Sequence, residues 1–220
     1  FAQFGRVNAD DNTVALDAGG TPDGLVQIND LDTTGISVNG GAVALFGTIE
    51  AVNEINLDGT SRITLTDTTT LITTSPDTDV IFDDGVGADG VNILDGEHGL
   101  VIVATGDVQF GQVSELTNLD VTAGNDPTNT NVATHSVTFH SNVTIPGNIA
   151  VTANDAIIVA DDTAATPAID STNGSITFTA ATGTTLNDDL AAAQDIRING
   201  LTTLATNDIS ITADSGSIDM

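Results

Sequence analysis

The chain of 220 residues carries 31 acidic side chains against three arginines and no lysine, which gives a formal net charge of −28. Nucleic acids are bound through basic patches, so this charge argues against a nucleic-acid partner and against adhesion to an anionic membrane. Cysteine is absent, which excludes disulfides, thiolate metal sites and a cysteine nucleophile. Apolar runs are far shorter than the roughly 20 residues of a membrane-spanning helix, so we expect no membrane insertion.

Short segments with apolar residues at positions i and i+2 follow one another from residue 36 to the end, a pattern typical of strands with one buried side. Gly, Asn and Asp recur between these segments, where turns are needed. The stretch 187–194 is the only candidate for a helical turn. The predicted strands lie near residues 36–38, 43–45, 55–57, 63–65, 71, 80–82, 91–93, 101–103, 108–110, 119–123, 137–139, 149–153, 157–159, 176–180, 186, 196–198 and 209–213.

One signature, apolar-x-apolar-Thr-Ala, occurs four times in the second half of the chain. It reads Leu119-Asp-Val-Thr-Ala123, Ile149-Ala-Val-Thr-Ala153, Ile176-Thr-Phe-Thr-Ala180 and Ile209-Ser-Ile-Thr-Ala213. A strand pattern that recurs at a nearly fixed period, here roughly 30 residues, indicates one unit stacked on copies of itself. We assign the signature to one face of a solenoid, which continues backward through 91–93, 63–65 and 36–38.

The remaining segments fit two further faces. The second face would hold 43–45, Leu71, 101–103, 157–159 and Leu186, and the third would hold 55–57, 80–82, 108–110, 137–139 and 196–198. Three strands in each period predict an all-β fold: a right-handed parallel β-helix of about seven coils of roughly 29 residues. The alternative is a tandem pair of immunoglobulin-like β-sandwiches, which would need no fixed period.

The composition favours a narrow solenoid core, because Trp and Tyr are absent and Phe is the one aromatic residue type. No linker interrupts the repeat, so we predict a single domain over residues 1–220, with residues 1–35 less regular. Neither end resembles the polar cap that a free solenoid needs. We therefore expect the domain to be part of a longer exported chain.

Several segments resemble the strand repeats of filamentous-haemagglutinin-like and related β-strand-repeat adhesins of bacteria. They are Gly106-Asp-Val-Gln-Phe110, Ser136-Val-Thr-Phe139, Asn207-Asp-Ile-Ser-Ile-Thr-Ala213 and two copies of the signature, at 119–123 and 149–153. The likeness covers residues from about 36 to 220. It implies a right-handed parallel β-helix, export across the outer membrane, and a role in adhesion, biofilm or surface-layer building.

The strongest candidate for a metal site is the segment from Asp83 to Val91 together with Asp95. Residues 84–91 resemble one calcium-binding nonapeptide of the repeats-in-toxin type, with Asp84 in place of the first Gly. Glycines permit the tight turn, and carboxylates supply the hard oxygen ligands that Ca²⁺ prefers. The predicted ligands are Asp83, Asp84, Asp89 and Asp95; a solvated Asp-Gly turn is the alternative.

We expect no enzymatic activity. Asp83-Asp84, His98-Gly99 and Arg197 superficially match the residue types of polygalacturonase-like β-helix hydrolases, but Arg197 lies several coils from the others. Lyases on this fold need cationic groups to stabilise a carbanion. This chain is nearly devoid of such groups, because it has three arginines and no lysine. His135 and His140 are five positions apart, which places them on opposite faces of a strand and makes them a poor metal pair.

The sequence thus predicts a structural segment of an extracellular bacterial surface protein or fibre that acts in adhesion, biofilm or envelope architecture. Two alternatives remain: a subunit that polymerises into an extracellular filament, and a carbohydrate-active β-helix. The expected partners are other copies of the chain, end to end or side by side, and glycans or a neighbouring cell surface, with calcium as a possible bridge between acidic rods.

Overall fold

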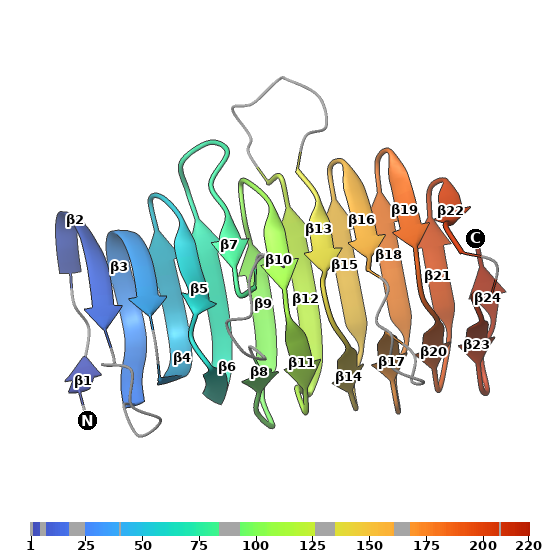
Figure 1. The fold of residues 1–220 in the computed structure, drawn as a ribbon, viewed down its shortest axis with the longest axis horizontal. Coiled ribbons are helices and arrows are strands. Elements are labelled where there is room, and N and C mark those ends of the chain that lie inside the picture. The colour runs from blue at the N-terminus through green and yellow to red at the C-terminus, as the bar shows by residue number, and fades with distance from the viewer. Residues whose placement is uncertain are drawn as a thin grey trace.

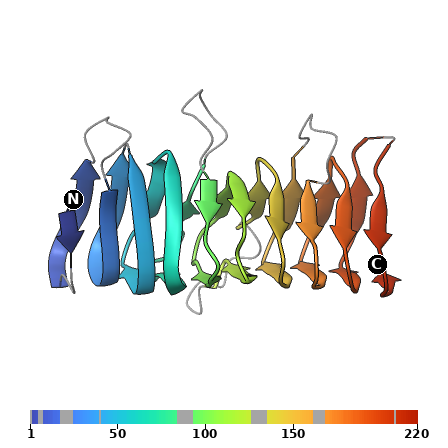
Figure 2. The same ribbon diagram turned by 90° about the horizontal axis from the view of Figure 1, so that it is seen from below.

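The computed structural model describes residues 2–4, 8–17, 25–39, 41–83, 93–125, 135–160, 168–206 and 208–220. Their 24 strands join one sheet of parallel strands, and none of these residues is helical. The sheet winds into a right-handed parallel β-helix, as the sequence predicted. The strands stack along the long axis from β1 and β2 at one end to β22, β23 and β24 at the other (Figure 1). The turned view shows the same row of coils (Figure 2).

Three faces run along the stack, and the chain visits them in the order 1, 2, 3. Four long strands bend across more than one face: β2 (Asn8–Asp17), β3 (Leu25–Asn39), β4 (Ala42–Ala51) and β6 (Arg62–Thr73). Face 1 holds β1 (Ala2–Phe4), the first parts of β3, β4 and β6, β8 (Ile93–Asp95), β11 (Gln112–Ser114), β14 (Val143–Ile145), β17 (Ile169–Ser171), β20 (Leu190–Ala192) and β23 (Ile211–Ala213).

The other two faces follow in the same manner. Face 2 holds parts of β2, β3, β4 and β6, then β9 (Gly99–Val103), β12 (Asn118–Ala123), β15 (Ile149–Ala153), β18 (Ile176–Ala180), β21 (Ile196–Asn199) and β24 (Ile218–Asp219). Face 3 holds the last parts of β2 and β3, then β5 (Ile55–Gly59), β7 (Val80–Ile81), β10 (Val108–Phe110), β13 (Val137–Phe139), β16 (Ala156–Val159), β19 (Gly183–Leu186) and β22 (Thr202–Leu204).

The period-2 pattern explains which side chains enter the core. In β18, Ile176, Phe178 and Ala180 are buried, and the intervening Thr177 and Thr179 are partly exposed. This strand pairs in register with the strands on either side, so buried residues stack on buried residues along the axis. The core is therefore a narrow column of Ile, Val, Leu, Ala and Phe that runs along the helix.

Four phenylalanines form a continuous stack inside this column. The ring centroids of Phe82 and Phe110 are 5.2 Å apart, those of Phe110 and Phe139 5.1 Å, and those of Phe139 and Phe178 6.3 Å. The first three lie on face 3, and Phe178 comes from β18 on face 2. Stacked rings at these distances gain contact energy beyond the burial of their area.

The predicted coil length and coil number are wrong. Face 1 has ten rungs within the described residues, not about seven. One short coil on that face brings Val43 beside Val26, whereas a later coil, nearly twice as long, brings Leu94 beside Ile63. The longest coils contain the undescribed segments 84–92, 126–134 and 161–167. Strands fix only part of each coil, so the length of a corner segment can vary without changing the register.

The signature repeats are only partly equivalent. Residues 119–123, 149–153 and 176–180 pair in register on face 2, as predicted. The fourth copy does not continue that face, because Ile211–Ala213 pairs with Leu190–Ala192 on face 1. The strand that follows β18 on face 2 is β21, in which Ile196 pairs with Ile176 after a coil shorter than the predicted period.

Several other predictions about which face a strand lies on, or which of its residues are buried, were only partly correct. The strands at 55–57, 80–82, 108–110 and 137–139 share face 3, as predicted, but Ile196 belongs to face 2. In β9 the buried residues are Leu100 and Ile102, not Val101 and Val103, because a continuous apolar run does not reveal which alternate positions point inward. Within 187–194 the chain forms strand β20, which is paired on both sides. Sheet pairing here overrides the helix preference of its alanines.

Candidate functional site

The corner between faces 2 and 3 carries a row of polar residues. Five consecutive rungs place a polar residue directly before a strand of face 3, and their main chains are hydrogen-bonded to one another, as in the 3.0 Å bond from Val80 N to Asp107 O. Four of the five are carboxylates. We call this row the acidic column: Glu54, Asp79, Asp107, Ser136 and Asp155.

Hydrogen bonds between rungs explain why Asp occurs at these positions. The backbone N–H of Asp107 donates to Asp79 Oδ1 at 2.7 Å, and the backbone N–H of Ser136 donates to Asp107 Oδ1 at 2.6 Å. Further along, the Thr182 hydroxyl donates to Asp155 Oδ1 at 2.7 Å. Backbone N–H groups in a turn have no hydrogen-bond partner in a neighbouring strand, and a short carboxylate side chain can accept their hydrogen bonds. The column therefore stabilises the turns in addition to carrying charge.

His135 lies against this column. Its side chain is 10% exposed; Nε2 lies 2.9 Å from Asp77 Oδ1, and Nδ1 lies 3.8 Å from Asp107 Oδ1. The other member of the histidine pair, His140, instead places Nε2 3.4 Å from Gln109 Oε1. The two histidines therefore contact different groups.

The side chain of Asp79, the second member of the acidic column, is partly buried. Burial raises its pKa above the ordinary value of 3.8, and the nearby charges of Asp107 and Glu54 act in the same direction. The hydrogen bond from the Asp107 amide and the proximity of His135 oppose the shift in this pKa without cancelling it. The charged form of Asp79 is therefore disfavoured in the folded protein relative to the unfolded chain.

We expect Asp79→Asn to raise the melting temperature at pH 7, because the amide keeps an oxygen for the Asp107 N–H and removes the charge. Because the pKa of Asp79 is higher in the folded protein than in the unfolded chain, the folded protein binds the proton at a higher pH. The difference in melting temperature between the variant and the wild type should therefore shrink as the pH falls through the raised pKa toward 3.8. Thermal melts monitored by circular dichroism between pH 7 and pH 4 measure it. Asp67→Asn, at an exposed carboxylate, is the control, and an equal gain in both variants would contradict the expectation.

A second polar row lies at the corner before face 2. Asn118 Oδ1 accepts a hydrogen bond from the backbone N–H of Asn148 at 3.1 Å, and Asn148 Oδ1 accepts one from the backbone N–H of Ser175 at 3.0 Å. Further along, Asp195 Oδ1 accepts one from the backbone N–H of Ser217 at 2.7 Å. The hydrogen bonds from Ser217 lower the pKa of Asp195, with a smaller contribution from Arg197. Sequence reasoning missed both rows, although the polar residue immediately before each strand was a visible signal.

The four predicted calcium ligands are only partly within the described structure. Asp84 and Asp89 lie outside the described residues. Asp83 follows β7, and Asp95 lies at the end of β8, where it forms an ion pair with Arg62. In the described part of the chain, no three His, Asp or Glu side chains form a group suited to a metal ion. The calcium site therefore stays a prediction.

His98 and Arg197, two of the residues that superficially match β-helix hydrolases, lie far apart, and Asp84 is outside the described residues. Arg197 lies on β21, and His98 directly precedes β9. Four pairing steps on face 2 separate β9 from β21, which corresponds to about 19 Å at the usual strand spacing. Arg197 Nε instead lies 3.7 Å from Asp219 Oδ2. His98 and Arg197 therefore lie on different coils and contact different groups.

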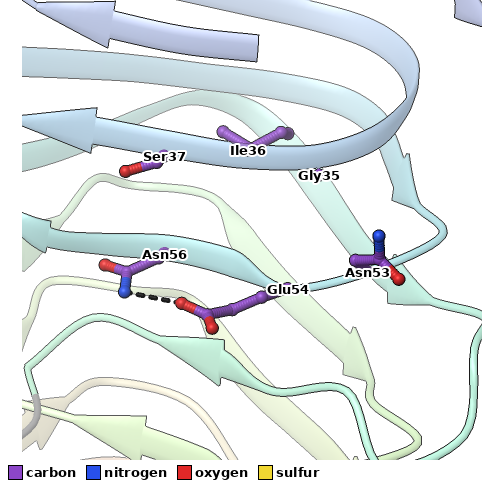
Figure 3. Close-up of a pocket in the computed structure, with 6 residues that line it drawn as sticks. All are labelled: Gly35, Ile36, Ser37, Asn53, Glu54 and Asn56. Atoms are coloured by element: carbon purple, nitrogen blue, oxygen red, sulfur yellow. Dashed lines mark hydrogen bonds between the residues drawn. The ribbon is translucent and has the colours of Figure 1, made fainter. Parts of the chain in front are cut away.

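One shallow depression lies near the start of the acidic column, with a volume of about 200 Å³ (Figure 3). Glu54 and Asn56 lie along one side of it and are joined by a hydrogen bond of 2.6 Å from Asn56 Nδ2 to Glu54 Oε1. The lining residues are Gly35, Ile36, Ser37, Asn53, Glu54 and Asn56.

Comparisons with known proteins found no matching family model, no matching curated protein and no matching solved structure. The part of the chain that the structure describes contains no helix that could cross a membrane.

Proposed function

We propose that this chain is a structural segment of an extracellular bacterial surface protein or fibre, with a role in adhesion, biofilm or envelope architecture. The observation that supports it best is the unbroken pairing of strands along face 1, from β1 to β23. Main-chain hydrogen bonds then run parallel to the long axis, and the polar rows reinforce two of the corners. Such a molecule resists bending and separates its two ends, which is what a scaffold requires.

The outer surface of face 2 supplies the surface through which such a scaffold would contact glycans or neighbouring rods. Thr122, Thr152, Thr179 and Asn199 occupy one row in register, and Asn199 Nδ2 donates to Thr179 Oγ1 at 3.0 Å. Hydroxyl and amide groups repeated at the strand spacing favour many weak contacts rather than one deep site.

Antibodies against residues 1–220 test the location and role. We expect them to label intact, unpermeabilised cells of the producing bacterium, because a surface scaffold is exposed to solvent. Labelling that appears only after lysis would overturn the proposal. Incubation of the purified chain with a panel of polysaccharides tests the carbohydrate-active alternative, for which release of reducing ends would be the positive result.

The edge formed by β22, β23 and β24 is a surface through which copies of the 220-residue chain could assemble end to end, a second candidate function. Leu204 and Ile218 occupy the positions that pair with the buried residues Leu186 and Ile196, yet they are 52% and 44% exposed. Strands β22, β23 and β24 are each paired on one side within the described residues. Open edges beside an apolar core surface attract further strands, and the next coil that fits is one of the same kind.

We expect the 220-residue chain to form linear assemblies as its concentration rises, and the double variant Leu204→Glu/Ile218→Glu to remain monomeric. Sedimentation velocity and negative-stain electron microscopy measure this. Val52→Glu is the matched control, because Val52 is 43% exposed at a corner away from this edge. If Val52→Glu abolishes assembly and the double variant does not, the contact is lateral rather than end to end.

A further inference from the structure

The structure holds a mostly buried histidine between carboxylates from different coils, in an arrangement that the scaffold role does not require. His135 precedes β13 by two positions, Asp107 directly precedes β10, and Asp77 lies in the loop before β7. These are three successive rungs of face 3. The imidazole therefore reaches past the rung of Asp107 to a loop that is 58 positions away in the sequence.

The loop that it reaches is compact and contains one unusual backbone conformation. Asp77 has a φ of 56°, in the left-handed region that non-glycine residues rarely adopt. Threonine hydroxyls hold the rest of the loop: Thr73 Oγ1 donates to Thr78 O at 2.9 Å, and the hydroxyls of Thr78 and Thr105 are 2.7 Å apart. A conformation of this kind persists when surrounding contacts favour it, and His135 is one of those contacts.

The charged groups that lie near the His135 ring are carboxylates. Asp77 and Asp107 face its two ring nitrogens, and Asp79 interacts with it through its charge. Asp155 is hydrogen-bonded through its backbone amide to His135 O at 3.0 Å. Of the described arginines, Arg62 pairs with Asp95 and Arg197 lies near Asp219. A protonated His135 is thus the one cation at this corner among the described residues.

The two protonation states differ in what the ring can do here. The neutral imidazole has one N–H donor, so one of its nitrogens presents a lone pair to a carboxylate. The protonated ring has two donors and a positive charge, so it can satisfy Asp77 and Asp107 together. Histidine side chains in general make this change between roughly pH 5 and pH 8.

We propose that His135 is a proton-operated latch, which fastens the loop 74–79 to the two following coils when it is protonated and loosens the loop when it is neutral. The latch would stiffen the middle of the rod in acidic surroundings. This inference rests on the contacts of His135 and Asp77, and does not depend on where the protein is located.

Hydrogen exchange followed by mass spectrometry tests the latch. We expect the protection factor of amides in 74–79, corrected for the intrinsic effect of pH, to be about tenfold higher at pH 5.5 than at pH 8. His135→Gln should abolish that difference, since glutamine does not titrate. His140→Gln should keep it, because His140 contacts Gln109 and not a carboxylate.

A second variant keeps the test decisive if His135→Gln unfolds. Asp77→Asn leaves the histidine in place and removes the charge that faces Nε2, so the pH response of the loop should fall markedly while the circular dichroism spectrum stays that of the wild type. An unchanged pH response in either folded variant would overturn the latch. Asp79→Asn, tested in parallel, shows how much of the response comes from the acidic column itself.

Discussion

Phe110→Ala is expected to lower the free energy of unfolding by about 3–5 kcal/mol, the usual cost of truncating a fully buried phenylalanine. Phe110 is buried between Phe82 and Phe139, with ring centroids 5.2 and 5.1 Å away. Main-chain pairing on both sides of β10 holds its neighbours in place, so the column cannot collapse to fill the space. The variant therefore loses contacts with both rings and leaves a cavity in the middle of the core.

Urea denaturation followed by circular dichroism measures this loss, and the absence of Trp and Tyr rules out their intrinsic fluorescence as a probe. Phe46→Ala is the matched control. Phe46 lies on β4 and is only partly buried, so we expect it to cost about 1 kcal/mol. Similar losses in the two variants would contradict the continuous aromatic stack.

Gly147→Ala is the second substitution with a large expected effect. Gly147 lies in the corner between β14 and β15, where an added Cβ would sit 1.3 Å from the carbonyl oxygen of Thr117 in the preceding coil. On the other side, the Ser171 hydroxyl donates to Gly147 O at 2.6 Å. Because the neighbouring coils contact it from both directions, the corner must move, and we expect a loss of about 3 kcal/mol or more.

Gly99→Ala provides the comparison for this position. The nearest atom to an added Cβ at Gly99 is Thr68 Cγ2 at 3.7 Å, an ordinary contact distance. We expect a change within about 1 kcal/mol, since alanine in a compatible conformation also reduces the entropy of the unfolded chain. If Gly147→Ala were as mild as Gly99→Ala in the same denaturation experiment, the corners would be less closely stacked than described.

The corner residues of the candidate site were only partly predictable from the sequence. The recurrence of Asp and Asn between strands was visible as turn chemistry, but it did not reveal that these residues line up in rows along the corners. The contact between His135 and Asp77 was not visible, because it joins residues 58 positions apart through the stacking of three coils. Sequence spacing carries no information on which corners overlie one another when one coil is nearly twice as long as another.

The β-helix class and most of the strands could be predicted from the residues alone, because alternation of apolar and polar residues is a local property that each strand needs in order to have one buried side. The number of coils and the face of each strand became clear from the three-dimensional fold. Residues 119–123 and 209–213 have the same signature, yet β12 lies on face 2 and β23 on face 1. The physical reason is that a strand pairs with whichever neighbour the corner segments bring beside it, and those segments differ in length between one coil and the next.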